Sequence, residues 1–387
     1  MGSAVIAPAD DLSSELETCG TLVACRRRIL PDCVLSLGIR CLLMFILGLS
    51  TAAGNEASTD RPPSPALPER AAHDSDLSVD GPRGDLVVVL GAEGSPEFGE
   101  LFGEWSGVWE VAAKRGGLRF HLVGDLVGDA STASVKTRLH ELLRSQSEEQ
   151  EQPLWIVMIG HGTFDGRDAK FNLLGEDVST DELAAWLQTL ERPVAVLQCA
   201  SASAPFLEGL SGPNRVIISS TKSGQEINFA RFGGFLAAAW ADPNADLDKD
   251  SQVSLLEAFL RAARQTEEYY TGDNRLATEH PLIDDNGDAR GTRAAAFAGV
   301  RPVREADSGA TLDGYFAHQW VLHPSLDELQ LSPERQRRRD ELELQMIALR
   351  ERKAELDEDA YYAALETILV ELARVSLGVD ELERSSP

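Results

Sequence analysis

Two apolar, β-branched stretches of this chain each end at a side chain that can do chemistry. LWIVMIG (154–160) is followed by His161 and Gly162, and PVAVLQ (193–198) is followed by Cys199. Both stretches predict buried strands. The carboxyl ends of neighbouring parallel strands meet at one edge of a sheet, so we expect the thiol and the imidazole at the same edge. An imidazole beside a thiol can accept its proton and so activate the sulfur as a nucleophile.

The residues around this pair fit such chemistry, although a simpler interpretation stands beside it. Gly162 has no side chain at the point where a substrate backbone would approach, and its N–H can point at a developing oxyanion. The other histidines lie in a linker, inside predicted elements or beyond the fifth predicted strand: His73, His121, His140, His280, His318 and His323. On the alternative interpretation, Cys199 is a small hydrophobic side chain of the core and His161 is structural.

A second motif, DLDKDSQVSLLE (246–257), has the spacing of an EF-hand calcium loop. The predicted Ca²⁺ ligands are Asp246, Asp248, Asp250, Gln252 through its carbonyl, and Glu257, with Ser254 acting through water. Ser251 stands where such loops usually have glycine, which should cost about 1 kcal/mol at a positive φ. The alternative is an acidic surface turn. A second acidic run, DDNGD (284–288), has Ala295 where the last carboxylate belongs, so it is interpreted first as a turn and second as a calcium-assisting loop.

The cysteines and the first residues predict export. Four of the five cysteines lie within the first 41 residues, and Cys199 is the fifth. The basic run RRR (26–28) precedes CLLMFILGLSTAA (41–53), which has the form of a signal segment 1–53 with cleavage near Ala53. The apolar run is shorter than the roughly 20 residues of a membrane span. We therefore expect a secreted or cell-envelope (periplasmic) protein, with the membrane as a partner only if the leader is retained as an anchor. The mature chain would then hold a single thiol, which cannot form an intramolecular disulfide.

The pattern of elements predicts an α/β fold. A linker at 54–84, rich in proline, serine and charge, precedes a domain at 85–322. Strands are expected at 86–91, 118–124, 154–160, 193–199 and 215–221, with helices at 98–115, 133–146, 181–190, 204–210, 231–240 and 255–270, and a hairpin at 170–180. This alternation predicts a mostly parallel sheet sandwiched by helices. Residues 323–387 predict a helical hairpin with a break at 356–357, which either packs on the domain or mediates self-association.

The two strand-end motifs, IGHGTFDG (159–166) and LQCASAS (197–203), resemble the caspase, legumain and clostripain cysteine peptidases, and the chain is most similar to bacterial caspase-like members with an EF-hand-type calcium loop. Ala202 stands where legumain-like members have glycine, and Leu197-Gln198 stands where the family has an acidic residue and alanine. The resemblance implies a caspase-like fold, a dyad of His161 and Cys199, and oxyanion donors from the Gly162 and Cys199 backbones. It also implies cleavage of a peptide or protein after one preferred side chain.

In that family the segment after the fifth strand, here TKSGQEINFARFGG (221–234), borders the specificity pocket. Glu226 would favour a basic substrate residue, and Lys222 or Arg231 an acidic one; alternatively, all three are solvated loop charges. A formal net charge of −27 argues against nucleic acid and anionic membranes as partners.

The sequence thus favours an exported cysteine endopeptidase with a structural Ca²⁺ site that orders the loop after the fifth strand. One alternative is a catalytically silent calcium-binding interaction module on the same fold. Another is an unrelated doubly wound α/β protein in which Cys199 fills the core.

Overall fold

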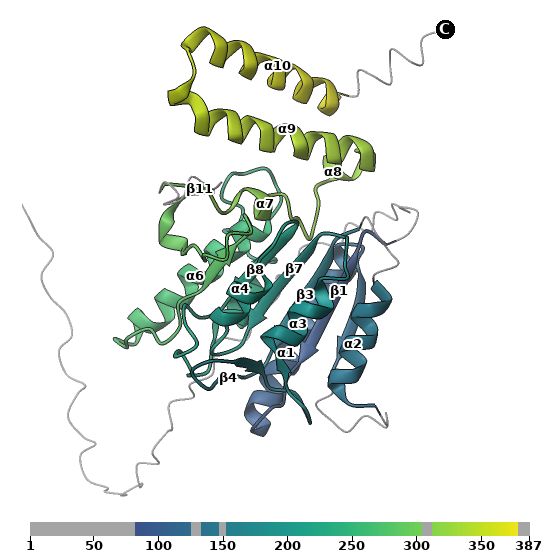
Figure 1. Ribbon diagram of the computed structural model, residues 1–387, viewed down its shortest axis with the longest axis vertical. Coiled ribbons are helices and arrows are strands. Elements are labelled where there is room, and N and C mark those ends of the chain that lie inside the picture. Colours follow the sequence, from purple (N-terminus) through teal and green to yellow (C-terminus); the bar gives the residue numbers. More distant parts are fainter. Residues whose placement is uncertain (1–81, 125–132, 147–151, 304–311, 378–387) are drawn as a thin grey trace, which may run out of the picture. The chain divides into compact units, whose positions relative to one another are not determined.

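The computed structural model describes residues 82–124, 133–146, 152–303 and 312–377. The predicted leader 1–53 and nearly all of the predicted linker 54–84 lie outside the described residues. The described residues form a six-stranded sheet in the order β2-β1-β3-β7-β8-β9 (Figure 1). Its strands are β1 (Asp85–Leu90), β2 (Arg119–Val123), β3 (Leu154–Ile159), β7 (Val194–Cys199), β8 (Arg215–Ser219) and β9 (Leu282–Asp284). The first five run parallel and β9 pairs antiparallel with β8, which confirms the predicted α/β fold with a mostly parallel sheet.

Helices cover both faces of this sheet, as the alternation of elements predicts. One face packs against α1 (Pro96–Arg115), α5 (Phe232–Ala239) and α6 (Leu255–Gly272). The other face packs against α2 (Val135–Ser145), α3 (Thr180–Leu187) and α4 (Ala204–Leu210). Because the central strands are buried on both faces, they are continuous apolar runs rather than alternating ones.

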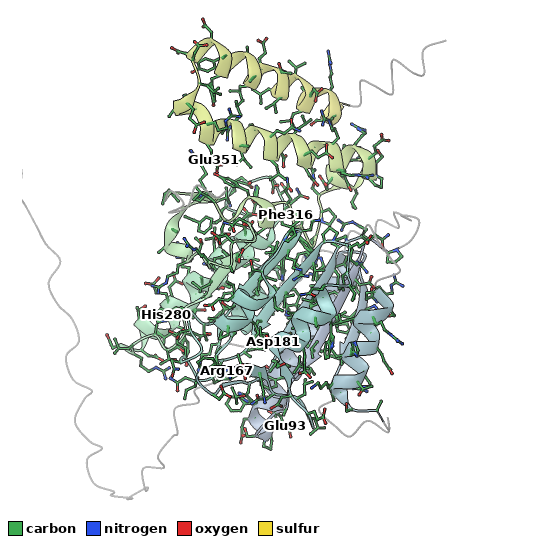
Figure 2. All side chains as sticks on the ribbon, in the orientation of Figure 1. Glu93, Arg167, Asp181, His280, Phe316 and Glu351 are labelled. Atoms are coloured by element: carbon green, nitrogen blue, oxygen red, sulfur yellow. The ribbon has the colours of Figure 1, made fainter. Side chains whose placement is uncertain are left out.

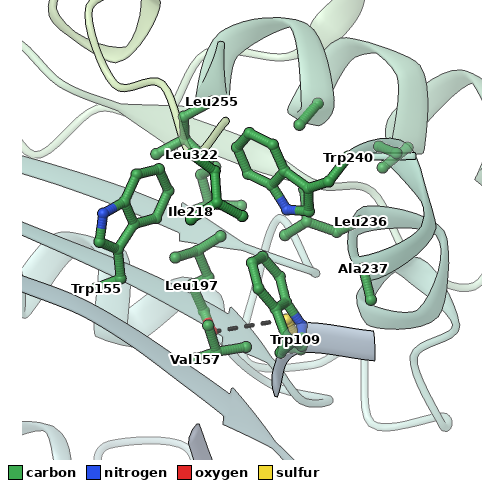
Figure 3. Close-up of a cluster of buried hydrophobic side chains, with 14 of the residues drawn as sticks. Trp109, Trp155, Val157, Leu197, Ile218, Leu236, Ala237, Trp240, Leu255 and Leu322 are labelled. Carbon is green, nitrogen blue, oxygen red and sulfur yellow. Dashed lines mark hydrogen bonds between the residues drawn. The ribbon is translucent and has the colours of Figure 1, made fainter. Parts of the chain in front are cut away.

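Tryptophans fill the core between α1, α5 and the sheet (Figure 3). The Trp240 ring lies 5.7 Å from that of Trp155 and 5.9 Å from that of Trp109, both edge to face. Trp320 reaches Trp155 from a distant part of the chain, with ring centroids 4.9 Å apart. These contacts tie the start of β3 to the end of α5.

A small antiparallel sheet follows β3. It consists of β4 (Gly162–Phe164), β5 (Ala169–Phe171) and β6 (Val178–Ser179), and the β5–β6 pairing confirms the predicted hairpin. The strand β9 and the short pair β10 (Phe297–Ala298) and β11 (Arg301–Pro302) are not predicted by the sequence. Each of these has only two or three residues, too few for a period to show.

The C-terminal segment forms two helices that begin at Pro333 and break near 356–357, as its capping pattern and break predict. Ser332 caps α9 (Pro333–Glu351), a 3-10 turn (Arg352–Glu355) follows, and α10 (Glu358–Leu377) returns along α9. Gln319, just after α7 (Tyr315–His318), donates to the Asp340 carbonyl of α9 at 2.9 Å. The hairpin therefore contacts the α/β domain, while self-association through it stays a prediction. None of the described helices is long and apolar enough to cross a membrane.

A buried ionic network links β1 to β2 and to the segment just before β7. Asp85, with no exposed side-chain surface, accepts from Arg192 Nη2 at 3.0 Å, Arg119 Nε at 3.0 Å and His121 Nε2 at 2.8 Å. Arg192 also donates to the Gln146 side chain and the Gln152 carbonyl, so its buried guanidinium is well satisfied.

Candidate functional site

Strand pairing brings His161 and Cys199 to the carboxyl edge of the sheet. The strands β3 and β7 are neighbours, and Ile159 lies opposite Cys199 in the register. Alternation turns both of these side chains toward α1 and α5. His161 follows two residues after Ile159, and its ring contacts aromatic side chains of α1, so it lies on the same face. The structure thus places the thiol and the imidazole at one edge and on one face.

The Cys199 thiol is buried behind α5, with 1% of the residue exposed. Its Sγ donates to the Leu197 carbonyl at 3.6 Å. Gly233 of α5 is required here, because a Cβ at that position would come within 3.2 Å of Sγ and 3.1 Å of the Trp105 ring. Burial, and to a lesser degree the charge of Glu279, raises the pKa of Cys199 well above its ordinary value. The thiol is therefore neutral in this conformation at physiological pH.

The His161 ring lies half-buried among aromatic side chains. Its centroid is 4.8 Å from Phe98, 5.4 Å from Phe102 and 5.8 Å from Phe229. Nε2 hydrogen-bonds the Glu93 carbonyl at 3.3 Å, and since a carbonyl only accepts, Nδ1 is left as the acceptor. Burial lowers the pKa of His161 despite that bond, so the imidazole is neutral. Within the described part of the chain, no hydrogen bond joins this ring to the Cys199 thiol.

Gly162 joins the His161 strand to the turn after Cys199. Its N–H donates to Ser201 Oγ at 3.2 Å, and that hydroxyl donates to the Gly162 carbonyl at 3.1 Å. A Cβ at Gly162 would lie 2.1 Å from the Ser201 carbonyl oxygen. The close approach that excludes a side chain is thus made by the turn itself rather than by a substrate. Sequence reasoning missed Ser201 because serine in a run of small residues carries no distinguishing signal.

Two further residues shape this edge: Ala202, which stands where legumain-like members have glycine, and Glu279, which the sequence analysis did not single out. Ala202 has φ +52, and its N–H donates to the Glu226 carbonyl at 2.8 Å, so this turn has the left-handed backbone that glycine adopts without strain. Glu279 is buried and accepts from the Arg231 and Phe232 N–H groups and the Tyr270 hydroxyl. Burial raises the pKa of Glu279 despite these bonds.

The three predicted specificity charges are each engaged with neighbours. Glu226 Oε1 lies 2.5 Å from His280 Nδ1 and 3.5 Å from Lys222 Nζ. The Arg231 guanidinium stacks over the Tyr269 ring at 4.8 Å and the Phe229 ring at 5.6 Å. Glu226 is thus attached to the turn after Cys199 through its backbone, and Arg231 to the aromatic cluster beside His161.

The acidic loop at 246–257 brings three predicted ligands together. Carboxylate oxygens of Asp246, Asp248 and Asp250 lie within 4.8 Å of one another and could hold a metal ion. Ser251 has φ +72, the left-handed conformation expected at its position in the loop. The residues present therefore fit a cation with oxygen ligands.

The remaining residues of this loop have other partners in the structure. Buried Glu257 accepts from the Leu247 N–H at 2.7 Å through one oxygen, and through the other it completes a capping box with Ser254 at the start of α6. The Gln252 side chain accepts from the Ser325 N–H. His318, which sequence reasoning did not connect with this loop, lies 3.3 Å from Asp248 Oδ2. Because His318 lies far from the loop along the chain, nothing in the sequence pattern indicates this contact.

This loop lies at the opposite end of α5 from the thiol. Gly233 at the start of α5 lies against Cys199, whereas Trp240, at its end, packs on Trp155 near the start of β3. Figure 2 shows the two edges, with Glu93 following β1 at one and Phe316 of α7 at the other. The expectation that a bound ion orders the segment after β8 rested on proximity along the chain, and α5 separates the two.

Replacing Ser251 by glycine is expected to raise the free energy of unfolding by about 0.5–1 kcal/mol. A left-handed non-glycine residue is strained by about 1 kcal/mol, and the greater freedom of glycine in the unfolded chain offsets part of the gain. Urea unfolding in calcium-free buffer measures the difference. Ser223→Gly is the matched control, since Ser223 has no positive φ and should lose stability. Equal losses at both positions would contradict the strain at Ser251.

No protein-family model and no curated protein matches the chain. Solved structures similar to it include protein GSU0716 of Geobacter sulfurreducens, with 12% identity, a TM-score of 0.36, and coverage of 52% of this chain and 93% of that chain. Caspase-1 of Spodoptera frugiperda has 10% identity and a TM-score of 0.34, covering 53% and 86%. The Drosophila initiator caspase Dronc has 13% identity and a TM-score of 0.35, covering 55% and 83%.

Proposed function

We propose that the protein is an exported cysteine endopeptidase in which Cys199 is the nucleophile and His161 the general base. The observation that carries the proposal is the register of β3 and β7, which sets His161 two residues beyond the partner of Cys199. Both side chains lie on the face that α1 and α5 cover. A thiol and an imidazole in this relation are the components of a nucleophile with its base.

The proposed chemistry uses the tautomer that the Glu93 carbonyl selects. His161 Nδ1 accepts the thiol proton while Cys199 Sγ attacks the scissile carbonyl carbon, and the ring returns the proton to the leaving amine. Water then hydrolyses the thioester and restores the thiol. The N–H groups of Gly162 and Cys199 are the proposed oxyanion donors, and Gly162 must exchange its bond to Ser201 Oγ for this role.

The described conformation is a closed resting state under this proposal. Cys199 and Trp105 both lie against Gly233, and the Trp105 ring packs on Phe102 and Phe229, which also contact His161. The sulfur is buried beside this cluster, so under this proposal a substrate reaches it only when the cluster opens. Neutral forms of both groups are what such a closed, poorly solvated site favours.

A calcium ion is the proposed resident cation of the loop at 246–257. Asp246, Asp248, Asp250 and the Gln252 carbonyl would hold it, together with Glu257 if that carboxylate exchanges its capping bonds. The hard oxygen donors suit Ca²⁺, which would supply structural order at the junction of α5 and α6.

The alternative, a catalytically silent calcium-binding module, is favoured by one observation. The thiol is almost wholly buried and bonded to a backbone carbonyl, as expected of a small core side chain. This alternative predicts that the sulfur reacts only when the protein unfolds.

Covalent capture by peptides that carry an electrophilic carbonyl separates the two functions. We expect a library of such peptides to label the native protein once, at Cys199, as located by peptide mapping. His161→Ala should slow labelling at least about 100-fold, because general-base assistance is typically worth 10²–10⁴-fold. His140→Ala, which changes an exposed side chain of α2, is the matched control and should label like wild type. Labelling that occurs only in denaturant, or that is equally fast in wild type and His161→Ala, would support the catalytically silent module.

A further inference from the structure

The DDNGD loop after β9 repeats the internal hydrogen bonds of the loop at 246–252. In the first loop, the N–H groups of Lys249, Asp250 and Gln252 donate to the side-chain oxygens of Asp246, Asp248 and Asp250. In the second, the N–H groups of Gly287, Asp288 and Arg290 donate to those of Asp284, Asn286 and Asp288. The donors and acceptors have the same spacing in both loops, and the second set of distances is 2.8–3.0 Å.

The backbone conformation repeats as well. The fourth and sixth residues are left-handed in both loops, with φ +67 and +72 at Lys249 and Ser251 and φ +77 and +61 at Gly287 and Ala289. Alanine has neither the freedom of glycine nor a side chain that can bond locally, so a left-handed Ala289 is strained by about 1 kcal/mol. The second loop thus keeps the backbone conformation of the first, although Ala289 disfavours a positive φ.

An independent observation points to a ligand at the second loop. Asp284 is 1% exposed, and its Oδ2 has no hydrogen-bond partner among the described residues. Its Oδ1 accepts from the Gly287 N–H at 3.0 Å, which turns this carboxylate into the loop. Burial raises the pKa of Asp284, although the nearby Ser211 hydroxyl and the Gly287 N–H act to lower it. A buried carboxylate oxygen without a partner is costly, and a cation is the ligand that would satisfy it.

We propose that residues 284–290 form a second cation site, distinct from the loop at 246–257, that takes a hard divalent ion such as Ca²⁺. The side chains of Asp284, Asn286 and Asp288 and the main-chain carbonyl of Arg290 supply the ligands, in the positions that Asp246, Asp248, Asp250 and Gln252 occupy in the first loop. Ala295 replaces the last carboxylate, so water completes the shell. With fewer charged ligands than the first loop, this site binds more weakly.

Asp285, between two of the proposed ligands, has a different role and is left intact in the test. It accepts from the N–H groups of Gly314 and Ala317 at the start of α7, at 2.8 and 2.6 Å. Its replacement would release α7 and disturb folding. Asp288 is the better position, because asparagine there keeps the oxygen that accepts from the Arg290 N–H and removes only the charge.

Equilibrium dialysis measures how many calcium ions the full chain binds. Calcium concentrations up to about 5 mM are needed, because the weakest calcium loops have dissociation constants near the millimolar range. We expect two ions per wild-type chain, one for Asp288→Asn, one for Asp250→Asn at the equivalent position of the first loop, and none for the double variant. Asp273→Asn, an exposed acid outside both loops, should retain two. Circular dichroism checks that Asp288→Asn is folded. If it is not, Asn286→Ala tests the same site and should also bind one ion.

A wild-type stoichiometry of one that Asp288→Asn leaves unchanged would overturn the second site. No binding at all would overturn both cation loops. Neither result depends on peptide hydrolysis, so this proposal and the proposed enzymatic function fail separately.

Discussion

Replacing Cys199 by alanine is expected to reduce cleavage of a diverse peptide mixture by at least about 10³-fold, because the covalent route is lost with the sulfur. Alanine removes only the sulfur from a packed site, so the fold should persist, and the thermal midpoint reports this directly. Cleavage products identified by mass spectrometry, with calcium and with chelator, provide the measurement. Unchanged turnover in Cys199→Ala would assign any observed activity to another site.

The acid limit of that activity should lie below about pH 6.5, the ordinary pKa of histidine. His161 must be neutral to accept a proton, and it is neutral above its pKa. Because burial lowers that pKa, the loss of activity on acidification is displaced to lower pH. Phe229→Ala, which opens the aromatic surroundings of the ring, should move the acid limb back toward the ordinary value, whereas His140→Ala should not move it.

Replacing Asp85 by alanine is expected to cost about 3–5 kcal/mol of the free energy of unfolding, because it leaves the Arg192 charge buried without its counterion. The Arg192 side chain is 1% exposed, so water cannot take the place of the carboxylate. Urea unfolding measures the loss. Glu268→Ala removes an exposed pair with Arg264 and is the matched control, with an expected change of at most about 0.5 kcal/mol. Similar small changes for both variants would show that the network is not stabilising.

The same network should make stability depend on acid pH. Burial alone would raise the pKa of Asp85, but the hydrogen bonds from His121 and Arg192 and the nearby arginine charges outweigh it and lower the pKa. A carboxyl whose pKa falls on folding contributes stability above its unfolded pKa, near 4, and loses that stability as the pH falls through the folded value. The slope of unfolding free energy against pH below about pH 4 should therefore be steeper in wild type than in Asp85→Asn.

The sequence predicted the elements of the sheet well because burial on both faces leaves a strong local signal. The runs at 86–91, 154–160 and 193–199 became β1, β3 and β7, and the helical hairpin began at Pro333 as its capping pattern indicates. The strand β9 escaped prediction since its three residues gain their order from pairing with β8 rather than from their own pattern.

The calcium motif and the pair of His161 and Cys199 were also visible in the sequence, because residue spacing and strand-end position are local properties. Their surroundings were decided by tertiary contacts. Gly233 packs against the thiol, Ser201 accepts from the Gly162 N–H, and His318 reaches Asp248 from a distant segment.

By itself, then, the sequence determined which segments form strands and helices, and which oxygens, sulfur and ring nitrogen stand at their ends, since these follow from local periodicity and spacing. Only the tertiary structure decided that the sulfur is closed off from solvent, that the acidic loop lies at the far end of α5, and that the DDNGD turn has the same backbone shape as that loop. Each of these depends on packing between residues far apart in the chain, and pairwise contacts of that kind leave no periodic trace in a single sequence.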